Sequence, residues 1–283
     1  MTEALRAAGD LSPALEADWT LAEQRLRQSL RQGGPLLVAY SGGVDSAYLS
    51  WVAHQVLGDQ LVALIADSPS LARSHYRDAL AFAARHGIPC ETIQTAELDS
   101  PEYAHNGADR CFFCKDELFH CMEGELERRP AFQSLAYGAN ADDRWDYRPG
   151  AEAARRHHVR APLLEAGLGK AAIRALARQA GLELWDRPAS PCLASRVVHG
   201  IGITPSVLGR IEAGEEGLRK MGFREFRARD HGDLVRIEIA PAELDRALNL
   251  EAAGALTRLF KGLGFRYVTL DLEGFRSGSL NPR

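Results

Sequence analysis

A glycine-containing loop between an apolar strand and a helix constrains this chain more than any other segment. Residues 36–40 form the apolar run expected of a buried strand, and residues 47–57 have the pattern of an amphipathic helix. The loop between them begins with Ser41, Gly42, Gly43, Val44, Asp45 and Ser46. Glycine lets a ligand approach the main chain, and the free N–H groups at a helix start attract an anion. The pattern predicts a phosphate-binding loop at the carboxyl end of a parallel strand.

The order of residues in this loop narrows the class of phosphate site. It is not a Walker A loop, which would end in Gly-Lys-Ser or Gly-Lys-Thr. It resembles the PP-loop of the ATP pyrophosphatases, Ser-Gly-Gly-x-Asp-Ser, at all six positions. That resemblance implies cleavage of ATP between the α- and β-phosphates and activation of a substrate oxygen as its adenylate. The alternative is an ordinary tight turn, but the strand before the loop and the helix after it favour nucleotide binding.

Composition excludes several other classes of protein. The chain has 283 residues, of which 46% are hydrophobic and 25% are charged, as in ordinary globular proteins. No apolar run reaches membrane-spanning length, and charged residues interrupt the N-terminal segment where a signal peptide would be apolar. We therefore expect a cytoplasmic protein. The net charge of −4 argues against a dedicated nucleic-acid binder.

Strands alternate with helices through the first part of the chain. We expect apolar strands at residues 36–40, 61–66, 90–95 and 134–139, with helices at 15–30, 71–86 and 170–180. This alternation predicts an α/β fold with a doubly wound parallel sheet. Residues 1–12 are expected to be a flexible N-terminus, and residues 13–187 the PP-loop domain.

The pattern changes after residue 187. Residues 188–202 are rich in proline and glycine and show no period, so we expect a cysteine-bearing loop. Helices are then expected at 205–220, 241–250 and 251–262, and strands at 226–228, 234–240 and 265–272. Residues 230–233 suit a hairpin turn. The sequence thus predicts a second, smaller α+β domain at residues 203–283.

Five cysteines, an odd number, argue against a disulfide framework in a reducing compartment. Cys192 lies in a proline-punctuated loop with Ser195 and Arg196 as polar neighbours. A cation close to a thiol favours the reactive thiolate form. The pattern therefore favours a reactive thiol over a buried structural cysteine.

Several segments, taken with residues 41–46, resemble the LarE family. These are ATP-dependent sacrificial sulfur transferases that help to build the nickel-pincer cofactor of lactate racemase. The segments that carry the resemblance lie at residues 67–70, 110–115, 138–143, 146–150, 188–196 and 272–279. Two positions depart from the family pattern: Ala139, where threonine is common, and Trp145, where glycine is common.

The resemblance implies a role for each candidate residue. Cys192 falls at the family's nucleophile, and the absence of other cysteines after Cys121 favours the sacrificial type over an iron–sulfur type. Asp45 is expected to act in catalysis. ATP with Mg²⁺ is expected to contact Ser41, Gly42, Gly43, Val44, Ser46, Asp67, Ser68 and Gly138. The implied substrate is a pyridinium mononucleotide with two carboxylates. We expect a homo-oligomer with no nucleic-acid or membrane partner.

Arginines in the second domain are candidate substrate ligands. Arg227 and Arg229 project from one face of a predicted strand, and Arg196 follows Cys192. The guanidinium fork matches phosphate oxygens, although a solvated sheet face is the alternative. Metal ligands cannot be assigned from the sequence; Glu216 and Asp245 are unsupported candidates.

Two further questions stay open in the sequence. Cys111 and Cys114 form a C-x-x-C motif without a second pair, which favours a structural or substrate-lining role over a metal or redox role. Rival functions are transfer-RNA thiolation and an NAD-synthetase-like ligation that uses ammonia and needs no cysteine at position 192. A nucleotide sensor without enzymatic activity is a third alternative.

Overall fold

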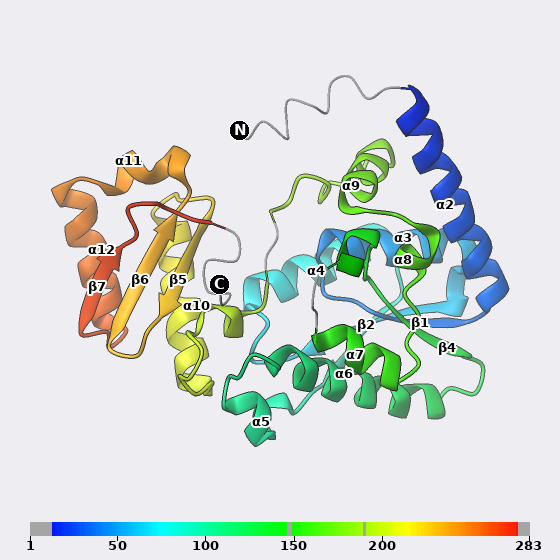
Figure 1. The fold of residues 1–283 in the computed structure, drawn as a ribbon, viewed down its shortest axis with the longest axis horizontal. Coiled ribbons are helices and arrows are strands. Elements are labelled where there is room, and N and C mark those ends of the chain that lie inside the picture. Colours follow the sequence, from blue (N-terminus) through cyan, green and yellow to red (C-terminus); the bar gives the residue numbers. More distant parts are fainter. Residues whose placement is uncertain (1–12, 146–148, 189–190, 277–283) are drawn as a thin grey trace. The chain divides into compact units, whose positions relative to one another are not determined.

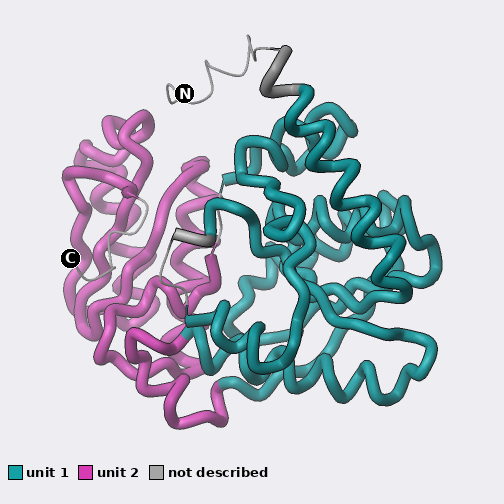
Figure 2. The backbone as a smooth tube through the Cα atoms, turned by 45° about the vertical axis from the view of Figure 1, so that its right-hand side comes forward, with its two compact units in different colours: residues 1–97, 111–190 teal, residues 98–110, 191–283 magenta. Residues whose placement is uncertain are grey.

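The chain forms two compact units, which Figure 2 shows in different colours. The computed structural model describes residues 13–145, 149–188 and 191–276. The first unit contains residues 1–97 and 111–190, and the second contains residues 98–110 and 191–283. The expected flexible N-terminus lies outside the described residues, as do parts of the 146–150, 188–196 and 272–279 segments.

A four-stranded parallel sheet forms the centre of the first unit, in the order β3-β2-β1-β4. Its strands are β1 (Leu36–Ala39), β2 (Leu61–Asp67), β3 (Cys90–Gln94) and β4 (Ser134–Tyr137). In β1, Ala39 lies opposite Leu64 of β2 and Tyr137 of β4. This arrangement confirms the predicted α/β fold.

Alternate residues of the strands face opposite helical layers, as expected for strands that are buried on both faces (Figure 1). Leu36 and Val38 pack in one core, and Leu37 and Ala39 in the other. The first layer consists of α2 (Pro13–Gly33), α3 (Val44–Leu57), α4 (Arg73–Arg85), α8 (Pro162–Ala166) and α9 (Lys170–Gln179). The second consists of α6 (Arg110–Glu127) and α7 (Pro149–Arg156).

The strand order determines where the first unit can bind a ligand. The chain passes from β1 to β2 to β3 on one side of β1, and then returns to place β4 on the other side. The carboxyl ends of β1 and β4 therefore flank a topological switch point. Open α/β sheets bind ligands at such a point because the connecting loops diverge there.

The second unit combines a three-stranded sheet with helices. Its strands are β5 (Phe226–Asp230), β6 (Leu234–Ile239) and β7 (Tyr267–Leu270); β5 and β6 are antiparallel, and β6 and β7 are parallel. Side chains of α10 (Pro205–Lys220), α11 (Leu244–Ala247) and α12 (Leu250–Gly262) share one core with Phe226, Ala228 and Ile237. This unit is the predicted small α+β fold.

Some sequence predictions need correction. Helices α6, α7 and α8 were not expected, because α7 and α8 are too short to show a full period and charged residues interrupt α6. Strand β5 extends two residues beyond the expected 226–228, and β7 is shorter than the expected 265–272. Short 3₁₀ turns also occur: η2 (Gly58–Gln60), η3 (Glu97–Asp99), η4 (Ala141–Trp145), η5 (Leu193–Arg196) and η6 (Pro241–Glu243).

The boundary between the units also differs from the expected one. Residues 98–110, including α5 (Pro101–Ala104), group with the second unit, as does the Cys192 segment from residue 191 onward. The physical reason is a set of hydrogen bonds from Asn106 and Arg110 to the segment at 194–201. The cysteine-bearing segment is therefore part of a packed unit and is not a separate loop between two domains.

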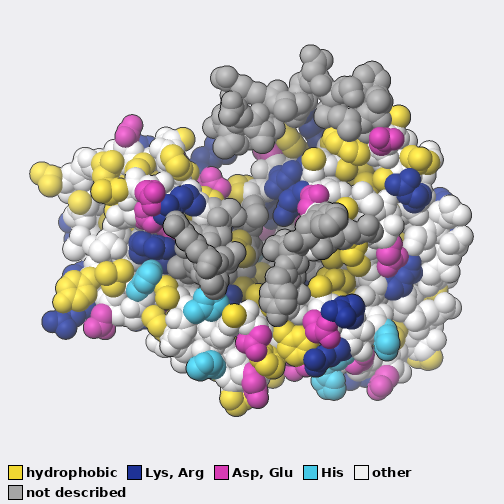
Figure 3. Space-filling view, in the orientation of Figure 1, with side chains coloured by type: hydrophobic (Ala, Val, Ile, Leu, Met, Phe, Trp, Pro, Cys, Tyr) yellow, Lys and Arg dark blue, Asp and Glu magenta, His cyan; other side chains and the backbone are white. Residues whose placement is uncertain are grey.

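The molecular surface shows mixed charge. Basic and acidic side chains are interspersed on the face of each unit that Figure 3 shows. Within the part of the chain that the structure describes, no helix is long and apolar enough to span a bilayer.

Candidate active site

The segment from Ser41 to Ser46 leads from β1 into α3 at the carboxyl edge of the sheet. The Ser41 N–H donates to Ser46 Oγ at 3.2 Å, and the two hydroxyl oxygens lie 3.1 Å apart. Gly42 has a φ of +72°, a left-handed conformation that favours glycine. Within the described residues, no side chain caps α3 at Gly43. The first N–H groups of α3 are therefore available to an anion.

The segment after β4 lies against this loop. A Cβ at Gly138 would lie 2.8 Å from the Ser46 nitrogen, so only glycine permits this approach. The Asn140 side chain is 1% exposed, and its Nδ2 donates to Asp45 Oδ2 at 3.1 Å. The other oxygen, Asp45 Oδ1, is buried and has no hydrogen-bond partner among the described residues. Asp45 thus presents one free carboxylate oxygen beside the loop.

The surroundings of Asp45 affect its pKa in opposite directions, with a net increase. Burial raises the pKa of Asp45, while the positive charge of Lys170 and the hydrogen bond from Asn140 lower it. Lys170 begins α9, and its N–H donates to Asp142 Oδ2 at 2.7 Å. Sequence reasoning missed Asn140 and Lys170. The position of Asn140 just after β4 could have identified it, whereas no sequence signal connects Lys170 with the loop.

Asp67 is the last residue of β2, the strand beside β1, and Ser68 directly follows it. Asp67 forms an ion pair with Arg73, and the hydrogen bond from Arg73 lowers the pKa of Asp67. Arg73 Nη2 also donates to the Ser68 carbonyl at 2.7 Å. The Ser68 hydroxyl donates to Glu97. The predicted nucleotide-binding residues of the first unit therefore all lie on a strand end, in a connecting loop or in the first turn of α3, at one edge of the sheet.

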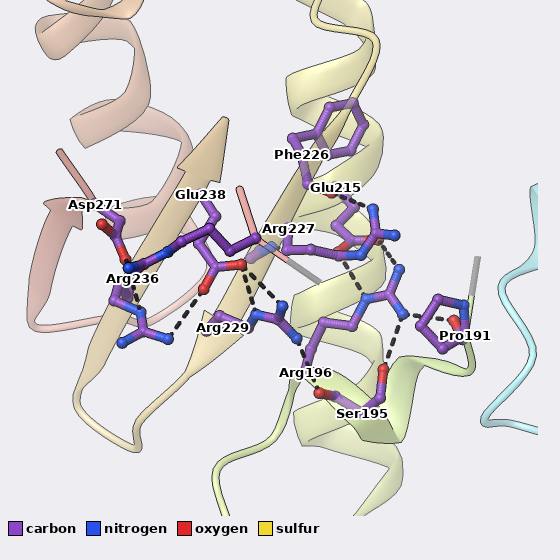
Figure 4. Close-up of polar contacts among 12 residues, drawn as sticks. Pro191, Ser195, Arg196, Glu215, Phe226, Arg227, Arg229, Arg236, Glu238 and Asp271 are labelled. Carbon is purple, nitrogen blue, oxygen red and sulfur yellow. Dashed lines mark hydrogen bonds and ion pairs between the residues drawn. The ribbon is translucent and has the colours of Figure 1, made fainter. Parts of the chain in front are cut away.

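The remaining predicted residues belong to the second unit. Cys192 is partly buried and directly precedes η5. Its carbonyl accepts hydrogen bonds from Arg196 Nη1 at 3.0 Å and Ser195 Oγ at 2.7 Å. Figure 4 shows Arg196 directed toward both Pro191 and Glu215. The main chain around the thiol-bearing residue is therefore held by side-chain contacts on η5.

Glu215 on α10 is the acidic partner of Arg196. Arg196 Nε lies 2.9 Å from Glu215 Oε1, and Nη2 lies 3.2 Å from Oε2, a bidentate arrangement. Arg196 is 1% exposed and Glu215 is 6% exposed. Sequence reasoning missed Glu215, although the spacing of Leu208, Ile211 and Leu218 places position 215 on the buried face of α10.

The neighbouring candidate Glu216 has a different environment. It forms an exposed ion pair with Arg219 on the same helix. Asp245 lies on α11. In the described ranges, no group of three or more His, Cys, Asp or Glu side chains is placed to hold a metal ion. Glu216 and Asp245 therefore gain no support as metal ligands.

Arg227 and Arg229 lie on the face of β5 that points away from the apolar core. They are 7% and 5% exposed, so the alternative of a solvated sheet face is wrong. Arg229 contacts Glu238 Oε2 through Nε at 3.0 Å and Nη2 at 2.8 Å, and its Nη1 donates to the Ser195 carbonyl at 3.1 Å (Figure 4). Burial, and next the charge of Arg196, lower the pKa of Arg227 to about 10.

This arginine cluster, which we define as Arg196, Arg227, Arg229 and Arg236, surrounds two buried carboxylates. Glu215 pairs with Arg196, and Glu238 pairs with both Arg229 and Arg236. Arg236 also pairs with a third carboxylate, that of Asp271. A group of guanidinium side chains close to the Cys192 segment suits an anionic ligand.

The other four cysteines differ from Cys192 in their surroundings. All five thiols are free. Burial raises the pKa of Cys90 and of Cys121 to about 11, which keeps both protonated at neutral pH. Cys111 is exposed near the start of α6, and Cys114 lies three residues further along. A structural or substrate-lining role for this pair stays a prediction.

The fold and phosphate loop of the first unit define a PP-loop protein. No family model matches the chain. The chain is 41% identical over 258 residues to an uncharacterised protein of Synechocystis sp., covering 91% of this chain and 96% of that protein. It is 32% identical over 265 residues to the pyridinium-3,5-bisthiocarboxylic acid mononucleotide synthase of Lactiplantibacillus plantarum, covering 93% of this chain and 95% of that protein.

A partial match supports the wider class. The chain is 28% identical over 131 residues to the glutamine-hydrolysing GMP synthase of Gloeobacter violaceus, which covers 44% of this chain and 24% of that protein. This match fits the PP-loop superfamily. The match to the L. plantarum synthase, which extends over nearly the whole of both chains, shows that this chain belongs to the LarE family.

We expect Asp45→Asn to stabilise the ligand-free protein by roughly 1 kcal/mol near neutral pH, because it removes a desolvated charge. The pKa of Asp45 is raised in the folded chain, so ionisation of Asp45 destabilises the folded state. This cost develops as the pH rises from the unfolded-state pKa to the folded-state pKa and is fully present above the folded-state pKa. Thermal unfolding of both proteins at about pH 5 and about pH 8 measures the difference, which should be no smaller at the higher pH.

Asp59→Asn is the matched control, because Asp59 is exposed in η2 and should have little effect. A lower melting temperature for Asp45→Asn than for the wild type at the higher pH would contradict this account of the Asp45 environment.

We expect Glu215→Ala to lower the free energy of unfolding by about 3–5 kcal/mol, because it leaves a buried guanidinium uncompensated. Glu216→Ala, one residue away but exposed, should change it by less than about 0.5 kcal/mol. Urea titrations followed by circular dichroism compare the two. Equal effects would show that the buried pair contributes no more than the surface pair.

Proposed function

We propose that this protein is an ATP-dependent sulfur transferase with Cys192 as its sacrificial sulfur donor. The substrate is a pyridinium mononucleotide that carries two carboxylates, and each turnover converts a carboxylate to a thiocarboxylate. Family membership supports this, as does the name of the L. plantarum relative, a bisthiocarboxylic acid mononucleotide synthase. The observation that carries the proposal is the Cys192 main chain, held by Ser195 and Arg196 next to buried arginines.

The first unit supplies the features that ATP requires. The uncapped start of α3 and the exposed Gly43 suit the phosphates. The buried, unpartnered Oδ1 of Asp45 suits a hard cation such as Mg²⁺, which prefers carboxylate oxygens. Bound there, Mg²⁺ would offset phosphate charge. Lys170 contributes a further positive charge near Asp45.

The first half of the reaction activates the substrate. A substrate carboxylate oxygen attacks the α-phosphorus of ATP, and the bond to the β-phosphate bridging oxygen breaks. The products are an acyl-adenylate and pyrophosphate. The N–H groups of the 41–46 loop would hold the phosphates during this step.

The second half transfers sulfur. The Cys192 thiolate attacks the acyl carbon and expels AMP, which forms a thioester with the protein. A base then removes the Cys192 Cα proton, and the electron pair of that C–H bond forms a Cα–Cβ double bond as the Cβ–S bond breaks. The sulfur leaves with the substrate as a thiocarboxylate, and residue 192 becomes dehydroalanine.

The arginine cluster would bind the phosphate of the mononucleotide. Arg227 and Arg229 project from the same face of β5, and the Ser195 carbonyl, three residues beyond Cys192, accepts a hydrogen bond from Arg229. Charge-assisted, bidentate contacts between arginine and phosphate would give both affinity and orientation. This assigns phosphate recognition to the same unit that carries the thiol.

We expect Arg227→Ala to weaken substrate binding by about 1.5–3 kcal/mol without a matching loss of ATP affinity, because a charge-assisted phosphate contact is removed. Isothermal titration with substrate and with ATP measures both affinities. Arg219→Ala, an exposed arginine of the same unit, should change neither. Unchanged substrate affinity in both Arg227→Ala and Arg229→Ala would exclude these residues from phosphate binding.

We expect Cys192→Ala to release pyrophosphate in the presence of substrate and ATP but to form no thiocarboxylate, because the phosphate loop and the thiol serve different steps. Cys121→Ala, which removes a protonated thiol, should retain both activities. Pyrophosphate assays with mass analysis of the small-molecule products make the comparison. Formation of an amide product by Cys192→Ala with ammonia as the nucleophile would favour the amidating ligase instead.

A further inference from the structure

A buried pair of polar side chains outside the proposed reaction contacts the Cys192 segment. Both come from residues 98–110, the stretch that groups with the second unit. Asn106 is 0% exposed and Arg110 is 8% exposed. No step of the proposed chemistry uses either residue, so their burial requires another explanation.

Asn106 holds the chain that follows η5. Its Nδ2 donates to the Val198 carbonyl at 2.9 Å and to the Ile201 carbonyl at 3.0 Å, with the Val197 carbonyl at 3.4 Å. Its φ of +60° lies in the left-handed region, which asparagine tolerates better than most residues. Side-chain donors and backbone conformation therefore both depend on asparagine at this position.

Arg110 connects Asn106 to η5 itself. One nitrogen, Arg110 Nη1, donates both to Asn106 Oδ1 and to the Ala194 carbonyl, the latter at 3.0 Å. Ala194 is two residues from Cys192. The carbonyls of residues 192 and 195 are bound by Arg196 and Arg229, as described above. Arg110 and Asn106 bind the carbonyls of 194, 198 and 201, so side-chain donors hold the main chain on both sides of η5.

We propose that Asn106 and Arg110 are positioning residues for the sulfur-transfer step, acting through the main chain of residues 192–201. The inference rests on the proposed role of Cys192. Thioester formation requires Sγ at the acyl carbon, and elimination requires alignment of the Cα–H and Cβ–S bonds. A displacement of about 1 Å costs up to about 100-fold in rate for reactions that depend on such alignment. Adenylation takes place at the phosphate loop of the first unit and does not involve the Cys192 thiol, so the two half-reactions can be separated experimentally.

The test compares Arg110→Met with Arg110→Lys in the full-length protein. Both keep a long side chain, but only lysine retains a donor for Ala194 and Asn106. Single-turnover reactions with ATP and the pyridinium biscarboxylate mononucleotide measure pyrophosphate and thiocarboxylate separately. In Arg110→Met, thiocarboxylate formation should slow by about tenfold or more while pyrophosphate release stays within about twofold. Arg110→Lys should recover most of the lost rate, and Arg219→Met should match the wild type.

A second variant covers poor folding of Arg110→Met. Asn106→Asp keeps the side-chain volume and removes the Nδ2 donors, so it should uncouple the two half-reactions in the same way. The rate of Cys192 alkylation by iodoacetamide, relative to exposed Cys111, provides a readout without turnover and should change in both variants.

Equal slowing of both half-reactions, or unchanged thiocarboxylate formation in Arg110→Met and Asn106→Asp, would overturn the inference. A wild-type protein that releases no pyrophosphate and forms no thiocarboxylate would instead overturn the proposed function. The two failures are therefore distinguishable.

Discussion

The buried ion pair between Arg196 and Glu215 is the interaction on which the second unit's site depends. Burying two charges is costly unless the partners are close and fully hydrogen-bonded, and this pair meets that condition with two contacts of 2.9 and 3.2 Å. The remaining donor, Nη1, is directed to the main chain at Pro191 and Cys192. The energy that fixes the guanidinium therefore also fixes the thiol-bearing residue, which a proline-rich loop alone could not do.

Different interactions fix the phosphate loop of the first unit. Its loop owes its conformation to the positive φ of Gly42, the two serine hydroxyls and the close approach of Gly138 to Ser46. The result is an uncapped helix start and one free carboxylate oxygen at a topological switch point. One unit thus carries features for nucleotide activation, and the other carries the thiol and the arginine cluster. Such a division suits a reaction that proceeds in two chemically distinct halves.

The sequence predicted what depends on local pattern and missed what depends on long-range pairing. The strand, loop and helix around residues 36–57 follow from apolar periodicity and two glycines, and the parallel sheet follows from their repetition. Helical periodicity could have predicted that Glu215 lies on the buried face of α10. The contacts of Asn106 and Arg110 were not, because they connect residues more than 80 positions apart, and no local pattern reports such pairing. The burial of Arg227 is a further case, since period-two alternation identifies its face but not what covers that face.

Peptide mass spectrometry after one turnover tests directly whether Cys192 gives up its own sulfur. The protein is incubated with ATP and the pyridinium biscarboxylate mononucleotide, without added sulfide, and then digested. We expect the peptide containing residue 192 to lose the mass of one H₂S, while Cys90, Cys111, Cys114 and Cys121 stay intact. An unmodified Cys192 beside an equivalent amount of thiocarboxylate product would contradict it.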